Sequence, residues 1–180
     1  MLVHSLLRND LGVDSPLHIS LSRPLVLKAE DKDIFLDRLK HLTNERGTKA
    51  VSIRSRHLAW HPNETKTRWF LVVHLAKSTQ LDKLLEICNG VAKEFQQPLL
   101  YAEAGQPKGD EFHISLGWSL HAPQSTESRL TASASSMGHN QGMSISPELM
   151  QQLSDLELDF QELKVRIGQD VNVVRLKPKR

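Results

Sequence analysis

The tetrapeptide His18-Ile19-Ser20-Leu21 recurs, residue for residue, as His113-Ile114-Ser115-Leu116 in a chain of 180 residues. Multiplying the chain's own residue frequencies gives such a repeat a chance of about one in two hundred, so we interpret it as a sign of internal duplication. Each copy alternates polar and apolar residues, which is typical of a strand with the histidine and the serine on one face. Two such strands, one in each half, predict two half-sites that face each other across a cleft.

The segments around the two motifs predict elements in a similar order. A strand over 17–21 is followed by a helix over 31–46, which Asp31 or Asp33 can cap and Gly47 can end. Two strands over 49–60 and 67–76 come next, joined by a turn at 61–64. The second series has a helix over 79–96, the motif strand over 112–119, a helix over 147–156, and strands over 159–167 and 171–177 around a turn at 168–170. We therefore predict an α+β fold, duplicated in two lobes, with two antiparallel sheets flanking a central groove and helices outside.

The length of the chain predicts one domain over residues 1–180, with intertwined lobes of about 1–76 and 77–180. Residues 121–146 are rich in Ser, Thr, Gln and Gly and poor in large apolar side chains. This composition predicts a flexible insertion that has no role in the core.

The overall composition is that of an ordinary globular protein. The chain is 39% hydrophobic and 24% charged, with a net charge of +2 that suits an anionic ligand but does not identify one. Cys88 is the single cysteine, which favours a reducing compartment. The N-terminus has no apolar core of the kind that secretory signals carry, and no stretch approaches the length of a membrane span. We expect a soluble intracellular protein.

Two histidines, each with a hydroxyl beside it, suit metal-independent cleavage of a phosphodiester. A ribose 2′-hydroxyl must lose a proton to attack phosphorus, and the departing 5′-oxygen must gain one. Imidazoles that titrate near pH 6.5 can supply both functions at neutral pH, so His18 and His113 are the candidate acid and base. The hydroxyls of Ser20 and Ser115 can donate to the non-bridging oxygens. The alternative, in which two half-buried strands merely happen to carry His and Ser, remains open.

The other histidines and the cysteine give weaker indications of a site. His41 is followed by Leu42 and Thr43, but this copy of the pattern falls inside the predicted helix, so we expect a surface histidine. His57 and His61 are four residues apart on a predicted strand and turn, where the helical spacing of metal ligands does not apply. Cys88 lies on an apolar helix stripe and is predicted to be part of the core. The sequence predicts no metal site.

The aromatic residues and the basic tail are further candidates for contact with RNA. Trp60 and Trp69 fall in predicted strands and are expected in the core, whereas Tyr101, the single tyrosine, precedes the second motif and is the better stacking candidate. The tail over 175–180 is expected to be a solvated end.

Paired His-x-Ser/Thr motifs in two lobes resemble the 2H phosphoesterase superfamily. Within it, Phe112-His113-Ile114-Ser115-Leu116-Gly117-Trp118 resembles the second motif of the U6 snRNA phosphodiesterases, a family of poly-U-specific 3′–5′ exoribonucleases. The run 67–71 (Thr-Arg-Trp-Phe-Leu) is similar to that family's strand between the motifs. Residues 18–22 resemble the first motif, and 164–168 the closing segment. The resemblance covers most of residues 4–120 and 147–178.

The resemblance implies a nuclear, metal-independent enzyme that trims uridines from the 3′ end of U6 snRNA. The penultimate 2′-hydroxyl would attack, leaving a 2′,3′-cyclic phosphate that some members open to a terminal phosphate. By motif match, His18 and His113 are the catalytic pair, and Ser20 and Ser115 hold the phosphate. The family pattern makes His113 the base and His18 the acid. RNA is the implied partner of a monomer that needs no cofactor and no membrane.

The chain departs from the family pattern at two places. Family members carry a strand and a helix before the first motif. Only sixteen residues precede the predicted strand of that motif here, so we expect a shortened first lobe. The family's base-stacking tyrosine lies close before the second histidine, and Tyr101 lies twelve residues upstream of it. Two other functions remain open: a 2H cyclic phosphodiesterase that acts on small or tRNA-derived cyclic phosphates, and a catalytically inactive RNA-binding module.

Overall fold

The structure is a computed structural model that describes residues 2–63, 65–101, 112–123, 152–153 and 156–179. The predicted insertion at 121–146, beyond residue 123, lies outside these residues, as does most of the predicted helix at 147–156. The chain divides into two compact units, each made of three separate segments. We name the unit of residues 1–18, 56–74 and 113–155 the histidine unit, and the unit of residues 19–55, 75–112 and 156–180 the helix unit.

The histidine unit is built on antiparallel strands in the order β1-β4-β3-β2. They are β1 (His4–Ser5), β4 (His113–Ser119), β3 (Trp69–Leu75, in this unit up to residue 74) and the second half of β2 (Val51–Pro62). The pairing of β3 with β4 changes register between Leu71 and Val72, since Leu71 is opposite Gly117 and Val72 is opposite Ser115. Leu116 is therefore an extra residue in β4 and forms a β-bulge.

The short strand β1 approaches β4 closely at Gly117. A Cβ atom at this position would lie 2.9 Å from the carbonyl oxygen of His4 and 3.2 Å from a methyl carbon of Val3. Glycine therefore permits the pairing of β1, in which His4 is opposite Trp118 and Ser5 is opposite Gly117.

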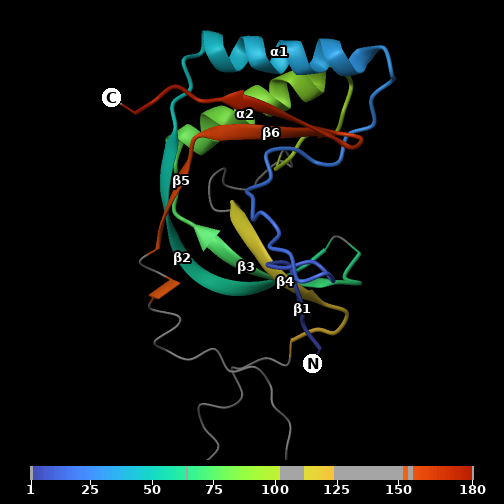
Figure 1. Ribbon diagram of the computed structural model, residues 1–180, viewed down its shortest axis with the longest axis vertical. Helices are drawn as coiled ribbons and strands as arrows, with labels where there is room; N and C mark the ends of the chain where they lie inside the picture. The colour runs from blue at the N-terminus through green and yellow to red at the C-terminus, as the bar shows by residue number, and fades with distance from the viewer. Residues whose placement is uncertain (1, 64, 102–111, 124–151, 154–155, 180) are drawn as a thin grey trace, which may run out of the picture. The chain divides into compact units, whose positions relative to one another are not determined.

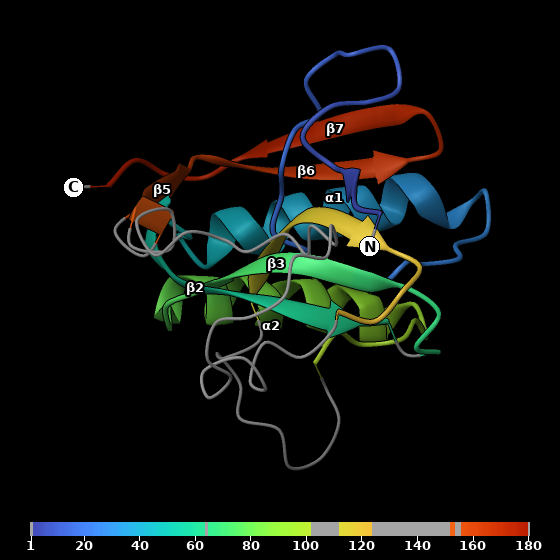
Figure 2. The same cartoon turned by 90° about the horizontal axis from the view of Figure 1, so that it is seen from below.

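The helix unit contains two helices, two antiparallel strand pairs and the intervening loops among its described residues. Helix α1 (Asp31–Glu45) lies beside α2 (Thr79–Glu94) (Figure 1). Strand β5 (Glu157–Phe160) pairs with the first half of β2, and β6 (Glu162–Ile167) forms a hairpin with β7 (Asp170–Arg175) (Figure 2). Gly168, at φ 62°, makes the predicted hairpin turn in the left-handed conformation that glycine favours.

The core of the helix unit forms where the two helices meet. Phe35 and Leu39 of α1 pack with Ile87 and Val91 of α2, and all four are at most 6% exposed. Val165 of β6 and Cys88 pack against the same cluster. At the surface, Arg38 of α1 binds both carboxylate oxygens of Glu94 of α2, at 2.9 and 3.0 Å. Cys88, which the sequence predicted in the core, is partly buried against it.

Both long helices were predicted within two residues of their bounds, but the cap of α1 differs from the prediction. Residue 30 is at the N-cap position and makes no side-chain cap bond, so neither Asp31 nor Asp33 caps the helix. Ile34 of α1 is 60% exposed, whereas the neighbouring Phe35 is buried. At α2, the hydroxyl of Ser78 accepts a hydrogen bond from the N–H of Leu81.

The first copy of the tetrapeptide is not a strand, and the prediction over 17–21 is wrong in this respect. Within 17–21 only Ile19 has a bridge partner, and the segment is otherwise irregular. Pro16 and Pro24 flank it, and a proline removes a backbone donor from a β-ladder. The second copy lies in β4 as predicted.

The structure also differs from three smaller predictions, on a turn, a strand and the C-terminal tail. Strand β2 continues through His61 and Pro62, where a turn was predicted. The predicted strand over 159–167 is two strands, β5 and β6, separated at Gln161. The C-terminal tail, expected to be a solvated end, is anchored: the N–H of Lys177 donates to the carbonyl of Thr48 at 2.9 Å, and Lys179 pairs with Asp159 at 3.1 Å.

Candidate active site

The second motif presents its histidine and serine on one face of β4. His113 is opposite His74 of β3, and Ser115 is opposite Val72, so all four belong to the same face of the strand pair. His113 and Ser115 are half-buried, whereas His74 is only 9% exposed. The alternation predicted from the sequence therefore holds for this copy of the motif.

Four histidines gather at the end of this face, which we name the histidine cluster (His57, His61, His74 and His113). The Nε2 atoms of His61 and His74 are 2.8 Å apart, a hydrogen-bonding distance. The ring of His57 stacks on that of His74, with centroids 4.5 Å apart and planes 19° apart. The ring of His113 lies 6.2 Å from that of His61 and 6.3 Å from that of His74.

Burial and neighbouring charge lower the pKa of His61 from its ordinary value. Burial is the largest cause, and repulsion from His113 and then from His57 adds to it. At neutral pH His61 is therefore uncharged. A bond between two Nε2 atoms needs one proton between them, so one ring donates and the other accepts. The cluster thus places a hydrogen-bonded imidazole pair, of which His61 is uncharged, beside the candidate base.

His57, His61 and His74 were not predicted from the sequence as residues of the site. The spacing of His57 and His61 was considered only for metal ligation on a helix. On strand β2 the same spacing puts both side chains on one face, because alternate residues of a strand share a face. His74 lies in the buried run of β3, and only the register of β3 with β4 brings it opposite His113. No group of three or more His, Cys, Asp or Glu side chains in the described ranges is arranged to hold a metal ion.

Trp118 lies further along the same face as His113. It is opposite Phe70 of β3, and Phe70 is four residues from His74, so both share a face of β3. The ring of His4 stacks on Trp118 at 4.2 Å, and the guanidinium carbon of Arg68 lies 4.7 Å from the centre of the Trp118 ring. The bulge at Leu116 produces this arrangement, because five residues of regular strand would have put Trp118 on the opposite face from His113.

Along the chain, the division between the two units falls within the first motif. His18 and Ser20 are both exposed, and the division between the units falls after His18. His18 belongs to the histidine unit with His113, whereas Ser20 belongs to the helix unit. The pairing of the two motifs across a cleft remains a prediction.

Tyr101 and Cys88 both lie in the helix unit. Tyr101 is half-buried at φ 52°, and its ring meets that of Phe112 edge to face at 5.9 Å. Its stacking on an RNA base remains a prediction. Burial raises the pKa of the Cys88 thiol to about 12, so this cysteine is a poor nucleophile near neutral pH. His41, predicted at the surface, is on the exposed side of α1, 3.6 Å from Glu45.

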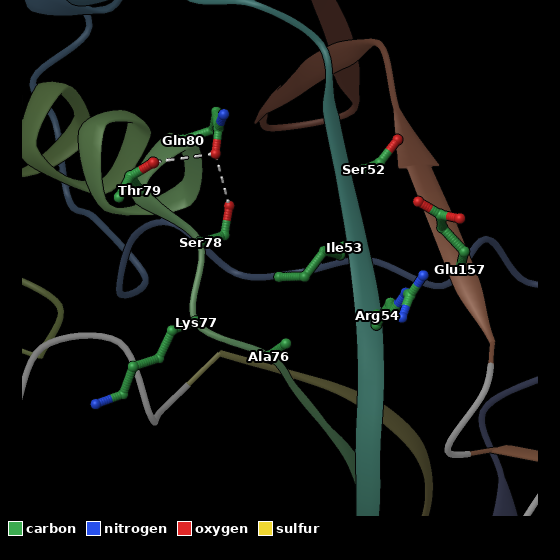
Figure 3. A pocket seen from close by; sticks show the side chains of 9 residues that line it. All are labelled: Ser52, Ile53, Arg54, Ala76, Lys77, Ser78, Thr79, Gln80 and Glu157. Carbon is green, nitrogen blue, oxygen red and sulfur yellow. Dashed lines mark hydrogen bonds between the residues drawn. The ribbon is translucent and has the colours of Figure 1, made fainter.

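The helix unit also has an open hollow of about 370 Å³ where β2 passes the start of α2 (Figure 3). Ser78 and Thr79 both hydrogen-bond to the side-chain oxygen of Gln80 on one side of it. Arg54 of β2 and Glu157 of β5 line the other side. None of the residues that the sequence predicted for the site lines this hollow.

Comparison with known proteins identifies the family to which the chain belongs. Residues 1–175 match the HVSL family, described as an uncharacterised conserved protein, and the chain belongs to that family. The chain is 32% identical over 187 residues to U6 snRNA phosphodiesterase 1 of Neurospora crassa, a match that covers 94% of this chain and 50% of the relative. It thus spans about half the length of that relative. This similarity confirms the relationship that the motifs predicted.

Two solved structures have a similar fold. They are Kluyveromyces marxianus Usb1, with a TM-score of 0.63 and 21% identity, and the same protein with uridine monophosphate, with a TM-score of 0.59 and 20% identity. Each comparison covers 97% of this chain and 81% of the other. The mixed fold of helices and antiparallel sheets is therefore confirmed. No helix among the described residues is long and apolar enough to cross a membrane.

Proposed function

We propose that the chain is an RNA phosphodiesterase, a 3′–5′ exonuclease that trims terminal uridines from U6 snRNA in the nucleus. The observation that supports this most strongly is the place of the second motif. His113 and Ser115 share a half-buried strand face beside the hydrogen-bonded pair His61 and His74, in a chain related to U6 snRNA phosphodiesterase 1 of Neurospora crassa. The paired-motif, two-lobe 2H arrangement is part of the same proposal.

The proposed reaction needs one base, one acid and donors to the phosphate. Nε2 or Nδ1 of His113 takes the proton of the penultimate 2′-hydroxyl, whose oxygen then bonds to phosphorus. The bond from phosphorus to the 5′-oxygen of the last nucleotide breaks, and His18 gives that oxygen a proton. A 2′,3′-cyclic phosphate remains on the shortened RNA. Each well-placed acid or base contributes about 10² to 10⁴ in rate.

The serine hydroxyls act on the charge that develops at the phosphate. Ser115, two residues beyond His113 on the same face, donates to one non-bridging oxygen, and Ser20 donates to another. Removing one donor of this kind from other enzymes costs about 3–4 kcal/mol of transition-state stabilisation. These residues supply the charge and proton transfers that the reaction requires, so we propose that it needs no metal.

The test is incubation of the purified chain, in excess chelator, with a 5′-labelled RNA that ends in uridines. We expect stepwise shortening by the wild type, loss of shortening in His113→Gln and His18→Gln, and wild-type activity in His41→Gln. His41 is the matched control because it also begins a His-x-Thr sequence but lies on helix α1. If either of the first two variants trims at a comparable rate, the paired-histidine mechanism is wrong.

Two further measurements separate the alternatives. A 2′,3′-cyclic nucleotide supplied alone distinguishes a cyclic phosphodiesterase, which opens it, from an exonuclease that acts on oligouridine. A folded wild-type protein that binds oligouridine but leaves it intact would instead be an RNA-binding module. Acid treatment of the shortened RNA followed by phosphatase reports whether the product end is cyclic or open.

A further inference from the structure

The group formed by Arg68, Trp118 and His4 has the properties of a binding site for an anion. Arg68 is exposed, and no carboxylate in the described part of the chain pairs with it. Its guanidinium is held against the Trp118 ring, 4.7 Å from the ring centre, which restricts its side chain before any ligand binds. His4 stacks on the same indole and adds a ring N–H donor.

The charge around this group is also cationic. Among the described residues of the histidine unit, the carboxylates are Asp10 and Asp14, and Asp14 already binds Arg8 at 3.0 Å. Against these two carboxylates, the same residues include four cationic side chains, Arg8, Arg56, Lys66 and Arg68. A polyanion is therefore the ligand class that this unit would attract.

The register of the sheet gives the separation between this group and His113. Trp118 and His113 are opposite Phe70 and His74, which are four residues apart on β3. At about 3.3 Å per residue, the two positions are roughly 13 Å apart along one face. This span is on the order of two nucleotide steps of an extended single strand.

We propose that Arg68, held by Trp118 and assisted by His4, binds a backbone phosphate of single-stranded RNA upstream of the bond that is cleaved at His113. Arg68 has the planar fork of donors that matches a phosphate. The subsite reads no base, so it contributes to affinity and to the preference for longer chains and leaves uridine preference to other contacts. The inference rests on the proposed function only in placing the 3′ end of the RNA at His113.

The test measures binding without cleavage, using fluorescein-labelled 2′-deoxy-oligouridines that lack the attacking hydroxyl. We expect Arg68→Gln to weaken binding of the hexamer about fivefold to tenfold, and to weaken binding of the dimer less. Loss of one phosphate contact should also reduce the slope of log K against log salt concentration by about 0.7 for a single strand. Arg68→Lys, which keeps the charge but not the fork, should fall between the two proteins.

Lys66→Gln is the matched control, because it removes the same charge at an exposed position two residues away, whereas the cation stacked on Trp118 is Arg68. Equal losses in Arg68→Gln and Lys66→Gln would overturn the proposal, since only net charge would then matter. Equal losses on the dimer and the hexamer would overturn the upstream placement. If the wild type binds with this pattern but cleaves no RNA, the proposed function fails and the subsite stands.

Discussion

The pKa of His61 predicts how the stability of the fold responds to acid. In the unfolded chain this histidine takes up its proton near pH 6.5, whereas burial and the repulsion from His113 and His57 lower its pKa in the folded protein. Between these two values the unfolded state holds more protons, so the free energy of unfolding falls as the pH falls. The stability linked to His61 is fully present above about pH 6.5. It is lost as the pH drops toward the pKa of His61 in the folded protein.

The size of this effect has an upper bound. One differential proton gives a slope of at most about 1.4 kcal/mol per pH unit. His61 is partly exposed, so solvent screening keeps its own contribution below this maximum. In His61→Gln the side-chain amide can still bond to Nε2 of His74 but cannot titrate. We therefore expect a shallower dependence of stability on pH in this variant than in the wild type.

Urea unfolding, followed by circular dichroism at a series of values between about pH 5.5 and pH 8, measures both slopes. His41→Gln is the control, since the His41 side chain is 66% exposed on α1, and it should keep the wild-type slope. A wild type that gains stability as the pH falls through 6.5 would refute the reasoning. So would a His61→Gln slope equal to that of the wild type.

Four further predictions concern packing. Ile87→Ala removes a side chain that is 1% exposed in the helix core and should cost about 2–5 kcal/mol in urea unfolding; a cost under about 1 kcal/mol would mean that the core is not closed there. Gly117→Ala should destabilise by about 1–3 kcal/mol, because the new Cβ meets the backbone of β1. Gly90→Ala, in open space on α2, should instead stabilise by about 0.5–1 kcal/mol, and the same sign for both glycine variants would contradict this account. Cys88 should resist a maleimide at pH 8 in the folded protein and react in urea, and rapid labelling without urea would show that its burial is wrong.

The helices could be predicted from the sequence because their signal is local. The apolar spacing of α2 predicts the stripe that is buried, from Leu81 to Val91, and the observed bounds differ from the prediction by at most two residues. The cap of α1 could not be predicted in the same way. Asp31 and Asp33 are both acceptable cap residues, but the helix begins one residue too early for either to cap it, and this start depends on the loop that leads into the helix.

The two copies of the tetrapeptide show that the alternation of polar and apolar residues does not by itself decide whether a segment forms a strand. Identical residues form a strand at 113–116 and an irregular segment at 18–21, because a strand requires a partner and the tetrapeptide does not contain one. The face shared by His113 and Ser115 follows from alternation alone. Three other features depend on how the strands pair: the contact of His61 with His74, the place of His74 opposite His113, and the bulge that turns Trp118 to the same face.

The interleaving of the two units limits how this protein can be divided. The chain passes from one unit to the other after residues 18, 55, 74, 112 and 155, so neither unit is a contiguous stretch of the gene. A terminal truncation that removes the whole of one unit also removes segments of the other. Many native contacts join residues far apart in sequence, which predicts slow folding for a chain of this length. An isolated histidine unit would require a rearranged gene with new linkers, whereas limited proteolysis would leave fragments that stay associated until they are denatured.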